Sequence, residues 1–203
     1  STGQTVSIIG AGVMGRGIGA AAARAGIPVR ISDADTMAAF DAVEQILASH
    51  DSRAGQSPRL VDPTARPLIS VATNDAAIAD ADLIIETVSE NFELKSSILS
   101  RIDPHLRSGT IIASNSSSLS MTQLSAALQN PGRFCGLHFC HPVSERPLVE
   151  VVHTEATTPE TLHRATAFAA SLRIAPIVVR DSPGFLLNRL LVPYLNESLE
   201  LLL

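Results

Sequence analysis

The sequence predicts a doubly wound α/β domain, in which helices cover both faces of a mostly parallel sheet. Residues 5–32 follow the order strand, helix, strand, and parallel neighbouring strands need such a helical crossover. Strand-like and helix-like segments then alternate as far as residue 115. The connection between the strands expected at 134–139 and 148–154 is too short for a crossover, so we expect this pair to be an antiparallel extension of the sheet.

Each segment has a local signature. The runs 5–10 and 27–32 are rich in β-branched residues, and Gly26 ends the Ala-rich helix expected at 13–25. Several prolines and a glycine predict a loop at 51–67. The other expected strands are 68–74, 82–88, 110–115 and 175–181. The other expected helices are 36–49, a short one before residue 82, 92–102, 158–172 and a last one from about Pro183.

The chain is expected to have two parts, a sheet domain at 1–182 and, at 183–203, the first helix of a second domain. Pro183 suits a helix start, whereas Pro193 should kink the helix axis. The helix closes on leucines without a cap, so its apolar face should pack on residues beyond the given sequence. We therefore expect that a C-terminal part is missing.

The composition argues against several classes of partner and site. The 203 residues are 45% hydrophobic and 17% charged with a net charge of -5, which gives no basic surface for a nucleic-acid backbone. No apolar run reaches the roughly 18 residues of a membrane span and no signal peptide is visible, so we expect a cytoplasmic protein without a membrane partner. Cys135 and Cys140 have neither redox-pair nor metal-pair spacing, and we expect packed thiols.

A glycine-rich stretch, "GAGVMG", follows the first strand and opens the first helix. In this context Gly10 permits a tight turn, Gly12 lets a pyrophosphate approach the backbone, and Gly15 lets helix and strand pack closely. Asp33 ends the next strand, where a carboxylate would accept from an adenosine ribose and repel a 2′-phosphate, so NAD is expected rather than NADP. The alternative is that Asp33 caps the following helix. The expected cofactor contacts in the loop are Gly10, Gly12, Val13, Met14 and Gly15.

Six motifs in order, "GAGVMGRG", "ETVSENFELK", "SNSSSL", "GLHFCHP", "PLVEVV" and "DSPGFLLNRLLVPYL", resemble the NAD-binding domain of the L-3-hydroxyacyl-CoA dehydrogenase family over nearly all of the chain. The resemblance implies a Rossmann-like domain, NAD as cofactor, and oxidation of a 3-hydroxyacyl thioester to the 3-ketoacyl form. It also implies a helical C-terminal domain, here largely absent, that forms a homodimer when present.

The resemblance assigns His138 as the catalytic base, Glu150 as the partner of its ring, and Ser117 and Asn188 as hydrogen-bonding partners of the substrate. An imidazole suits the task because hydride loss from a carbinol carbon requires removal of the hydroxyl proton. From the residues alone, a histidine in an apolar strand is more often a satisfied core residue. A serine in "SNSSSL" can equally cap a helix.

Glu90 and Lys95 match residues that hold the nicotinamide ribose, and Ser117 lies beside the nicotinamide in the family. The alternative for Glu90 and Lys95 is a surface ion pair. His141 stands where the family usually has an asparagine near the cofactor. A zinc site made of His138, Cys140 and His141 is the competing possibility, although neighbouring strand residues point to opposite faces.

The segment after Asp33 is short and broken by prolines, whereas the resemblance implies a longer helical hairpin there that helps hold the CoA nucleotide. Two carriers of the acyl group are considered: CoA, or an acyl carrier protein that contacts Arg53, Arg59 and Arg66. Two further alternatives are a dehydrogenase of a free 3-hydroxy (sugar) acid and a noncatalytic NAD-binding module.

Overall fold

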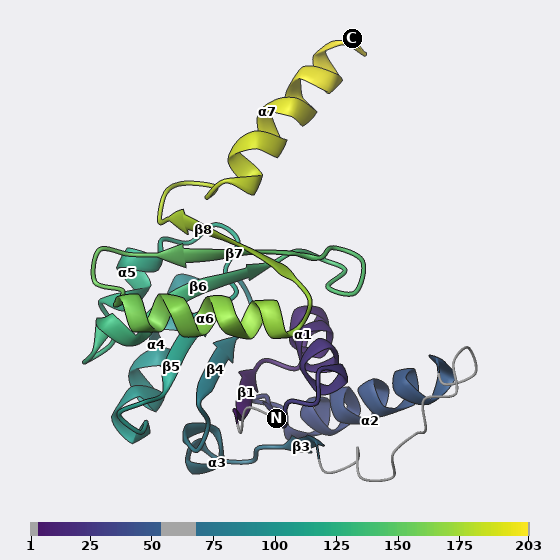
Figure 1. The fold of residues 1–203 in the computed structure, drawn as a ribbon, viewed down its shortest axis with the longest axis vertical. Helices are drawn as coiled ribbons and strands as arrows, with labels where there is room; N and C mark the ends of the chain where they lie inside the picture. The colour runs from purple at the N-terminus through teal and green to yellow at the C-terminus, as the bar shows by residue number, and fades with distance from the viewer. Residues whose placement is uncertain (1–3, 54–67, 203) are drawn as a thin grey trace.

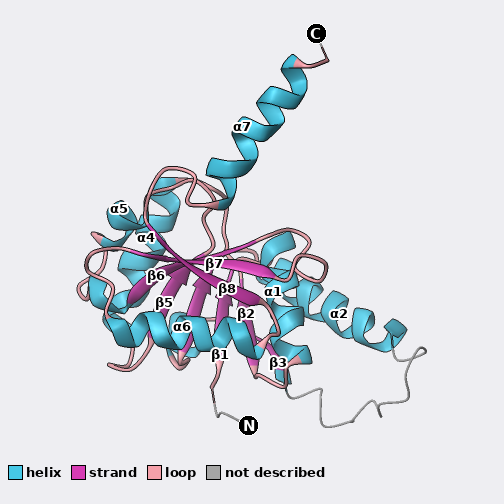
Figure 2. Ribbon diagram, turned by 45° about the horizontal axis from the view of Figure 1, so that its top comes forward, coloured by secondary structure: helices cyan, strands magenta, loops and turns pink. Residues whose placement is uncertain are grey.

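The computed structural model describes residues 4–53 and 68–202, and its centre is one eight-stranded sheet (Figures 1 and 2). The strand order is β3-β2-β1-β4-β5-β6-β7-β8. The strands are β1 Val6–Ile9, β2 Val29–Ser32, β3 Ile69–Val71, β4 Leu83–Glu86, β5 Ile111–Ser114, β6 Phe134–Phe139, β7 Leu148–His153 and β8 Ala175–Arg180. The predicted doubly wound α/β sheet is confirmed.

All strand pairs are parallel except β6 and β7, which run antiparallel as predicted. Their register places His138 directly opposite Glu150. Side chains of directly opposed residues in an antiparallel pair lie on the same face and close together. The short β6–β7 connection thus sets the geometry of the candidate site.

Helices cover both faces of the sheet, α1, α2 and α6 on one and α3, α4 and α5 on the other (Figures 1 and 2). Their bounds are α1 Val13–Arg24, α2 Thr36–Arg53, α3 Asp75–Ala79, α4 Phe92–Ile102, α5 Met121–Ser125, α6 Pro159–Ser171 and α7 Leu187–Glu200, with short 3₁₀ turns at Asp103–His105 and Pro131–Arg133. None of these helices in the described ranges is long and apolar enough to cross a membrane.

The core is apolar on both sides of the central strands. All four residues of β4 are buried, and Ile84 and Ile85 contribute to clusters on opposite faces. A strand buried on both faces is expected to be continuously apolar. Glu86, the last residue of β4, is 0% exposed and departs from that rule.

Two expected boundaries are wrong. The last helix begins at Leu187 rather than Pro183, because Gly184 (φ +74°) and Phe185 (φ +49°) adopt left-handed conformations that a right-handed helix excludes. Phe185 therefore does not share a helical face with Asn188. The loop expected at 51–67 begins later, since α2 continues to Arg53, and its residues 54–67 lie outside the described part of the chain.

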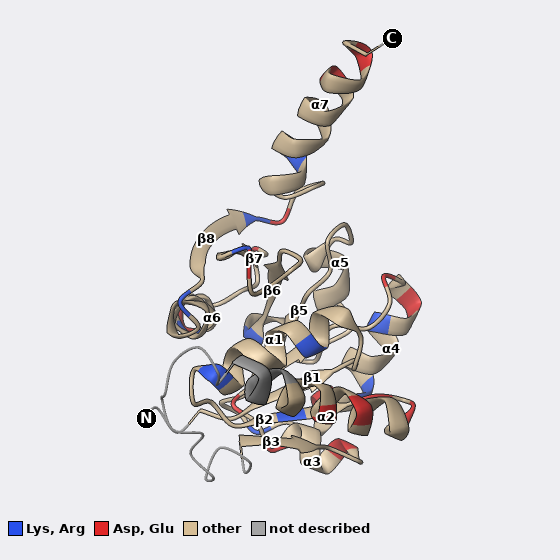
Figure 3. Cartoon of the chain, turned by 90° about the vertical axis from the view of Figure 1, so that its right-hand side faces the viewer, with Lys and Arg blue, Asp and Glu red and all other residues tan. Residues whose placement is uncertain are grey.

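Helix α7 projects away from the sheet domain, and none of its residues is buried (Figures 1 and 2). Figure 3 shows that it carries few charges between its two ends. Its exposed large apolar side chains are Leu190, Leu191, Val192, Tyr194, Leu195 and Leu199. The apolar face of α7 is thus exposed in the described part of the chain.

Candidate active site

The predicted site residues gather at the carboxyl edge of the sheet, where the glycine loop follows β1 and the "SNSSSL" loop follows β5. Parallel α/β sheets bind ligands at this edge. A cavity of about 680 Å³ lies there against Gly10, Gly12 and Asp33. The Oδ2 atom of Asp33 accepts a hydrogen bond from the backbone N–H of Ala11 at 2.8 Å. Asp33 thereby ties the glycine loop to the end of β2, and its other bond is to Asp35 N rather than to the first turn of α2.

The glycines divide into two kinds. A Cβ atom on Gly15 would lie 1.9 Å from the carbonyl oxygen of Gly10, so close packing of loop and helix requires glycine. A Cβ on Gly12 would have no protein atom within 4 Å. The space in front of Gly12 is therefore open at the N-terminus of α1, whose free N–H groups and dipole favour a phosphate. This arrangement fits the pyrophosphate of NAD. Next to it, Val13 is exposed and Met14 packs on the core.

A buried histidine–carboxylate pair links β6 and β7. The Nδ1 atom of His138 lies 2.7 Å from Oε2 of Glu150, and the residues are 5% and 1% exposed. The ring of Phe185 packs against the imidazole at 5.7 Å between centroids. The other oxygen of the carboxylate, Oε1, accepts from the backbone N–H groups of Leu186 and Leu187, both at 2.8 Å. These bonds supply the partners that a buried carboxylate requires.

The link from Glu150 to the start of α7 was not predicted from the sequence. It depends on the left-handed turn at Gly184 and Phe185, which aims two N–H groups back at the sheet. The only local signal is the "PG" pair in "DSPGF", which indicates a turn, although proline also suits the helix start expected there.

Ser117 is held at both ends of its backbone. Its N–H donates to Oε1 of Glu90 at 2.8 Å, and its carbonyl accepts from Nδ2 of Asn188 at 3.1 Å. Within the described residues its hydroxyl has no hydrogen bond, so this group is available to a ligand. The helix cap considered as the alternative is Ser120, which caps α5 through a bond from Gln123 N.

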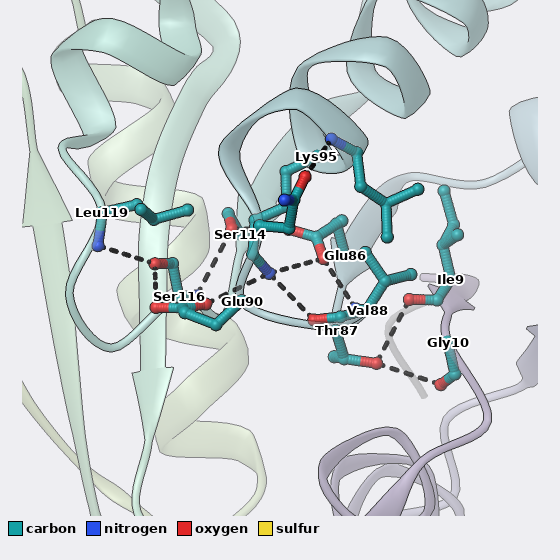
Figure 4. Close-up of polar contacts among 12 residues, drawn as sticks. Ile9, Gly10, Glu86, Thr87, Val88, Glu90, Lys95, Ser114, Ser116 and Leu119 are labelled. Carbon is teal, nitrogen blue, oxygen red and sulfur yellow. Dashed lines mark hydrogen bonds and ion pairs between the residues drawn. The ribbon is translucent and has the colours of Figure 1, made fainter.

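The side chain of Lys95 is 1% exposed and lies in the interior. The alternative, a surface ion pair, is therefore wrong. Its Nζ donates to Oε1 of Glu86 at 2.8 Å and lies 3.5 Å from Oε2 of Glu90 (Figure 4). Glu86 was not among the predicted site residues. A glutamate at a strand end has no sequence signal that distinguishes a buried partner from a surface residue.

Burial has different effects on the net pKa values of Glu90 and Cys135. It raises the pKa of Glu90, but hydrogen bonds from Ser116 and Ser117, the charge of Lys95 and a further bond from Ser118 outweigh it, and the net pKa lies below its usual value. Burial raises the pKa of Cys135 to about 12. Cys135 is thus an unreactive core thiol, in line with the packing prediction.

His141 is exposed and lines a second cavity of about 330 Å³ together with Val13 and Arg16. His141 is not among the residues that line the cavity at Asp33. In the described ranges no group of three His, Cys, Asp or Glu side chains could hold a metal ion, so His138, Cys140 and His141 do not form the competing zinc site.

Known proteins match this chain closely. The family model for the 3-hydroxyacyl-CoA dehydrogenase NAD-binding domain covers residues 5–182. The fatty acid oxidation complex subunit alpha of Idiomarina loihiensis is 36% identical over 195 residues, which are 95% of this chain and 27% of that protein. The chain thus spans about a quarter of that curated relative.

Solved structures of dehydrogenases are also similar to this chain. A 3-hydroxybutyryl-CoA dehydrogenase of Escherichia coli has a TM-score of 0.92 and 34% identity, covering 100% of this chain and 43% of its own. The (S)-3-hydroxybutyryl-CoA dehydrogenase of Ralstonia eutropha has a TM-score of 0.90 and 36% identity, covering 96% of this chain and 70% of its own. The matched family model, these likenesses and the glycine loop agree on NAD as the cofactor, and the chain belongs to the 3-hydroxyacyl-CoA dehydrogenase family as its NAD-binding domain.

Proposed function

We propose that this chain is the cofactor-binding and proton-transferring part of an enzyme that interconverts a 3-hydroxyacyl thioester and the 3-ketoacyl thioester. The observation that carries the proposal is the buried pair of His138 and Glu150 at the sheet edge that also holds the glycine loop. Two similar solved structures are named as 3-hydroxybutyryl-CoA dehydrogenases, which supports a 3-hydroxyacyl thioester as the substrate class.

His138 acts as the proton acceptor in the direction of oxidation. Oε2 of Glu150 accepts the hydrogen on Nδ1, which leaves Nε2 with the lone pair that takes the proton of the substrate hydroxyl. The carboxylate then stabilises the imidazolium that forms. In the reverse direction the same nitrogen returns the proton to the carbonyl oxygen.

Ser117 and Asn188 are proposed to hold the substrate oxygens. The backbone of Ser117 is fixed at both ends, so its free hydroxyl is preorganised to donate to the C3 oxygen. The amide of Asn188 uses one N–H for Ser117 O and keeps its second N–H for the substrate. When bound, NAD⁺ supplies the hydride acceptor, and the Gly10–Gly15 loop and Asp33 would hold it.

The handle of the acyl group is proposed to be CoA, with an acyl carrier protein as the alternative. Arg59 and Arg66, two of the expected contacts for the carrier, lie outside the described residues, and so does the side chain of Arg53. We further propose that α7 begins a helical domain through which the protein forms a homodimer, and that the protein is cytoplasmic.

Turnover of matched substrates tests the proposal. NADH absorbance should rise when L-3-hydroxybutyryl-CoA is added to the full-length protein and NAD⁺. Free 3-hydroxybutyrate should give no signal. The same acyl group on a carrier protein is the third arm, and faster turnover there would favour the carrier. Turnover of the free acid alone would support the sugar-acid type of dehydrogenase. NADH binding without turnover of any substrate would support a noncatalytic module.

A further inference from the structure

The lysine at position 95 is fully buried, although an ammonium group is costly to remove from water unless it is paired. It extends from α4 toward the ends of β4 and β5. Nζ donates to Oε1 of Glu86 at 2.8 Å and to the carbonyl of Val88 at 3.1 Å. Its third neighbour is Oε2 of Glu90 at 3.5 Å, so one cation lies between two carboxylates (Figure 4).

Glu86 is the inner carboxylate and ties two strand ends together. Besides Lys95, its Oε1 accepts from the N–H of Val88 at 2.7 Å, while Oε2 accepts from the hydroxyl of Ser114 at 2.6 Å. Ser114 ends β5, and the "SNSSSL" loop follows from it. Glu86, Lys95 and Ser114 are all buried, so the bonds among them are stronger than their counterparts in water.

Glu90 is the outer carboxylate and organises the serine loop. Its Oε1 accepts from the hydroxyl of Ser116 at 2.6 Å, from the N–H groups of Ser117 and Ser118 at 2.8 and 3.0 Å, and from the Ser118 hydroxyl at 3.1 Å. Its Oε2 faces Lys95, and 38% of the side chain remains exposed. One oxygen thus holds the loop, and the other is oriented by the lysine.

We propose that Glu86 and Lys95 are positioning residues, which fix Glu90 and through it the backbone of Ser117. Lys95 then acts from the interior, as a bridge between two carboxylates. Glu86 anchors this bridge to the sheet. The inference rests on the proposed function for its effect on turnover, but its effect on the loop is independent of any substrate.

Paired removal of the two buried charges tests the proposal. The double variant Glu86→Gln, Lys95→Met leaves no uncompensated charge in the interior, and such replacements often preserve the fold. Glu86→Gln alone, which keeps the shape and one acceptor oxygen, is the second variant. The matched control is Glu93→Gln, which removes an exposed carboxylate from the same helix.

Hydrogen exchange followed by mass spectrometry gives the first readout, in full-length protein without ligand. We expect the amides of Ser117 and Ser118 to exchange about 2- to 10-fold faster in the double variant, as for the weakening of one hydrogen bond. Glu86→Gln should give a smaller increase in the same peptide, and the control none. Wild-type exchange at both amides in a double variant that keeps its melting temperature would overturn the proposal.

Steady-state kinetics give the second readout. A displaced Ser117 should lower kcat about 10- to 100-fold, with a small change in KM for the thioester. A purely structural role would lower the melting temperature and leave kcat per folded molecule unchanged, which also counts against the proposal. If the wild-type protein turns over no thioester, the proposed function fails, and the exchange result still decides whether Glu86 and Lys95 position the loop.

Discussion

Two glycines of the loop are required for different reasons, one for the fold and the other for the cofactor. Gly15 is needed by the fold, because any side chain would collide with the Gly10 carbonyl. Gly12 has no such neighbour, and its backbone (φ −67°, ψ −172°) is accessible to every residue type. The need for glycine at position 12 thus comes from the ligand, which approaches the backbone closely at this point.

Alanine substitutions at the two glycines should therefore affect different quantities, folding stability at Gly15 and NADH affinity at Gly12. Gly15→Ala should lose about 3 kcal/mol or more of folding stability through overpacking. Gly12→Ala should stay within about 1 kcal/mol of wild type and lose NADH affinity. Denaturant unfolding and NADH titration measure the two quantities, and Gly109→Ala, at another open position, is the control. Wild-type NADH affinity in Gly12→Ala would contradict the assigned role of the glycine loop.

At the scale of elements, the short segment between β8 and α7 joins the His138–Glu150 pair to the rest of the domain. Oε1 of Glu150 anchors the start of α7. Farther back, Oδ2 of Asp181 accepts from Ser120 Oγ and Thr122 N, both at 2.8 Å, at the start of α5. Burial raises the pKa of Asp181, but the bonds from Thr122 and Ser120 outweigh it and leave the pKa below its usual value.

This shift predicts a pH-dependent contribution to stability. Because the pKa in the folded state is lowered, the contribution is complete above the unfolded-state pKa of about 3.9 and is lost as the pH falls through the folded-state value. Asp181→Asn should cost about 1 kcal/mol at pH 7, and the difference in melting temperature should shrink below about pH 4. Asp41→Asn, on an exposed face of α2, should show no such convergence. A difference that is constant with pH would exclude a charge effect of Asp181.

The elements also show where sequence reasoning succeeds and where it fails. The facing of His138 and Glu150 could be predicted, because a short connection between two strands forces an antiparallel pair. The start of α7 could not, because proline is favoured at the first position of a helix, whereas Phe185 adopts a left-handed conformation that is unusual for a bulky residue. Tertiary bonds to Glu150 accompany that conformation, and no local pattern indicates them.

For the whole molecule, the fold and the cofactor loop follow from local patterns, but the buried polar network does not. The order of strands and helices could be predicted because periodicity and glycine placement are local properties. Glu86 lies next to Lys95 and Ser114 only after β4, α4 and β5 have packed. A site assembled from three elements in this way has no signature in any one of them.

The central claim is that proton transfer by His138 is separate from binding of the cofactor, and one variant tests it most directly. His138→Ala should bind NADH like the wild type, since the glycine loop and Asp33 are untouched. Its kcat with L-3-hydroxybutyryl-CoA should fall about 100- to 10,000-fold, the usual contribution of a general base. Retained turnover with intact NADH binding would contradict the account.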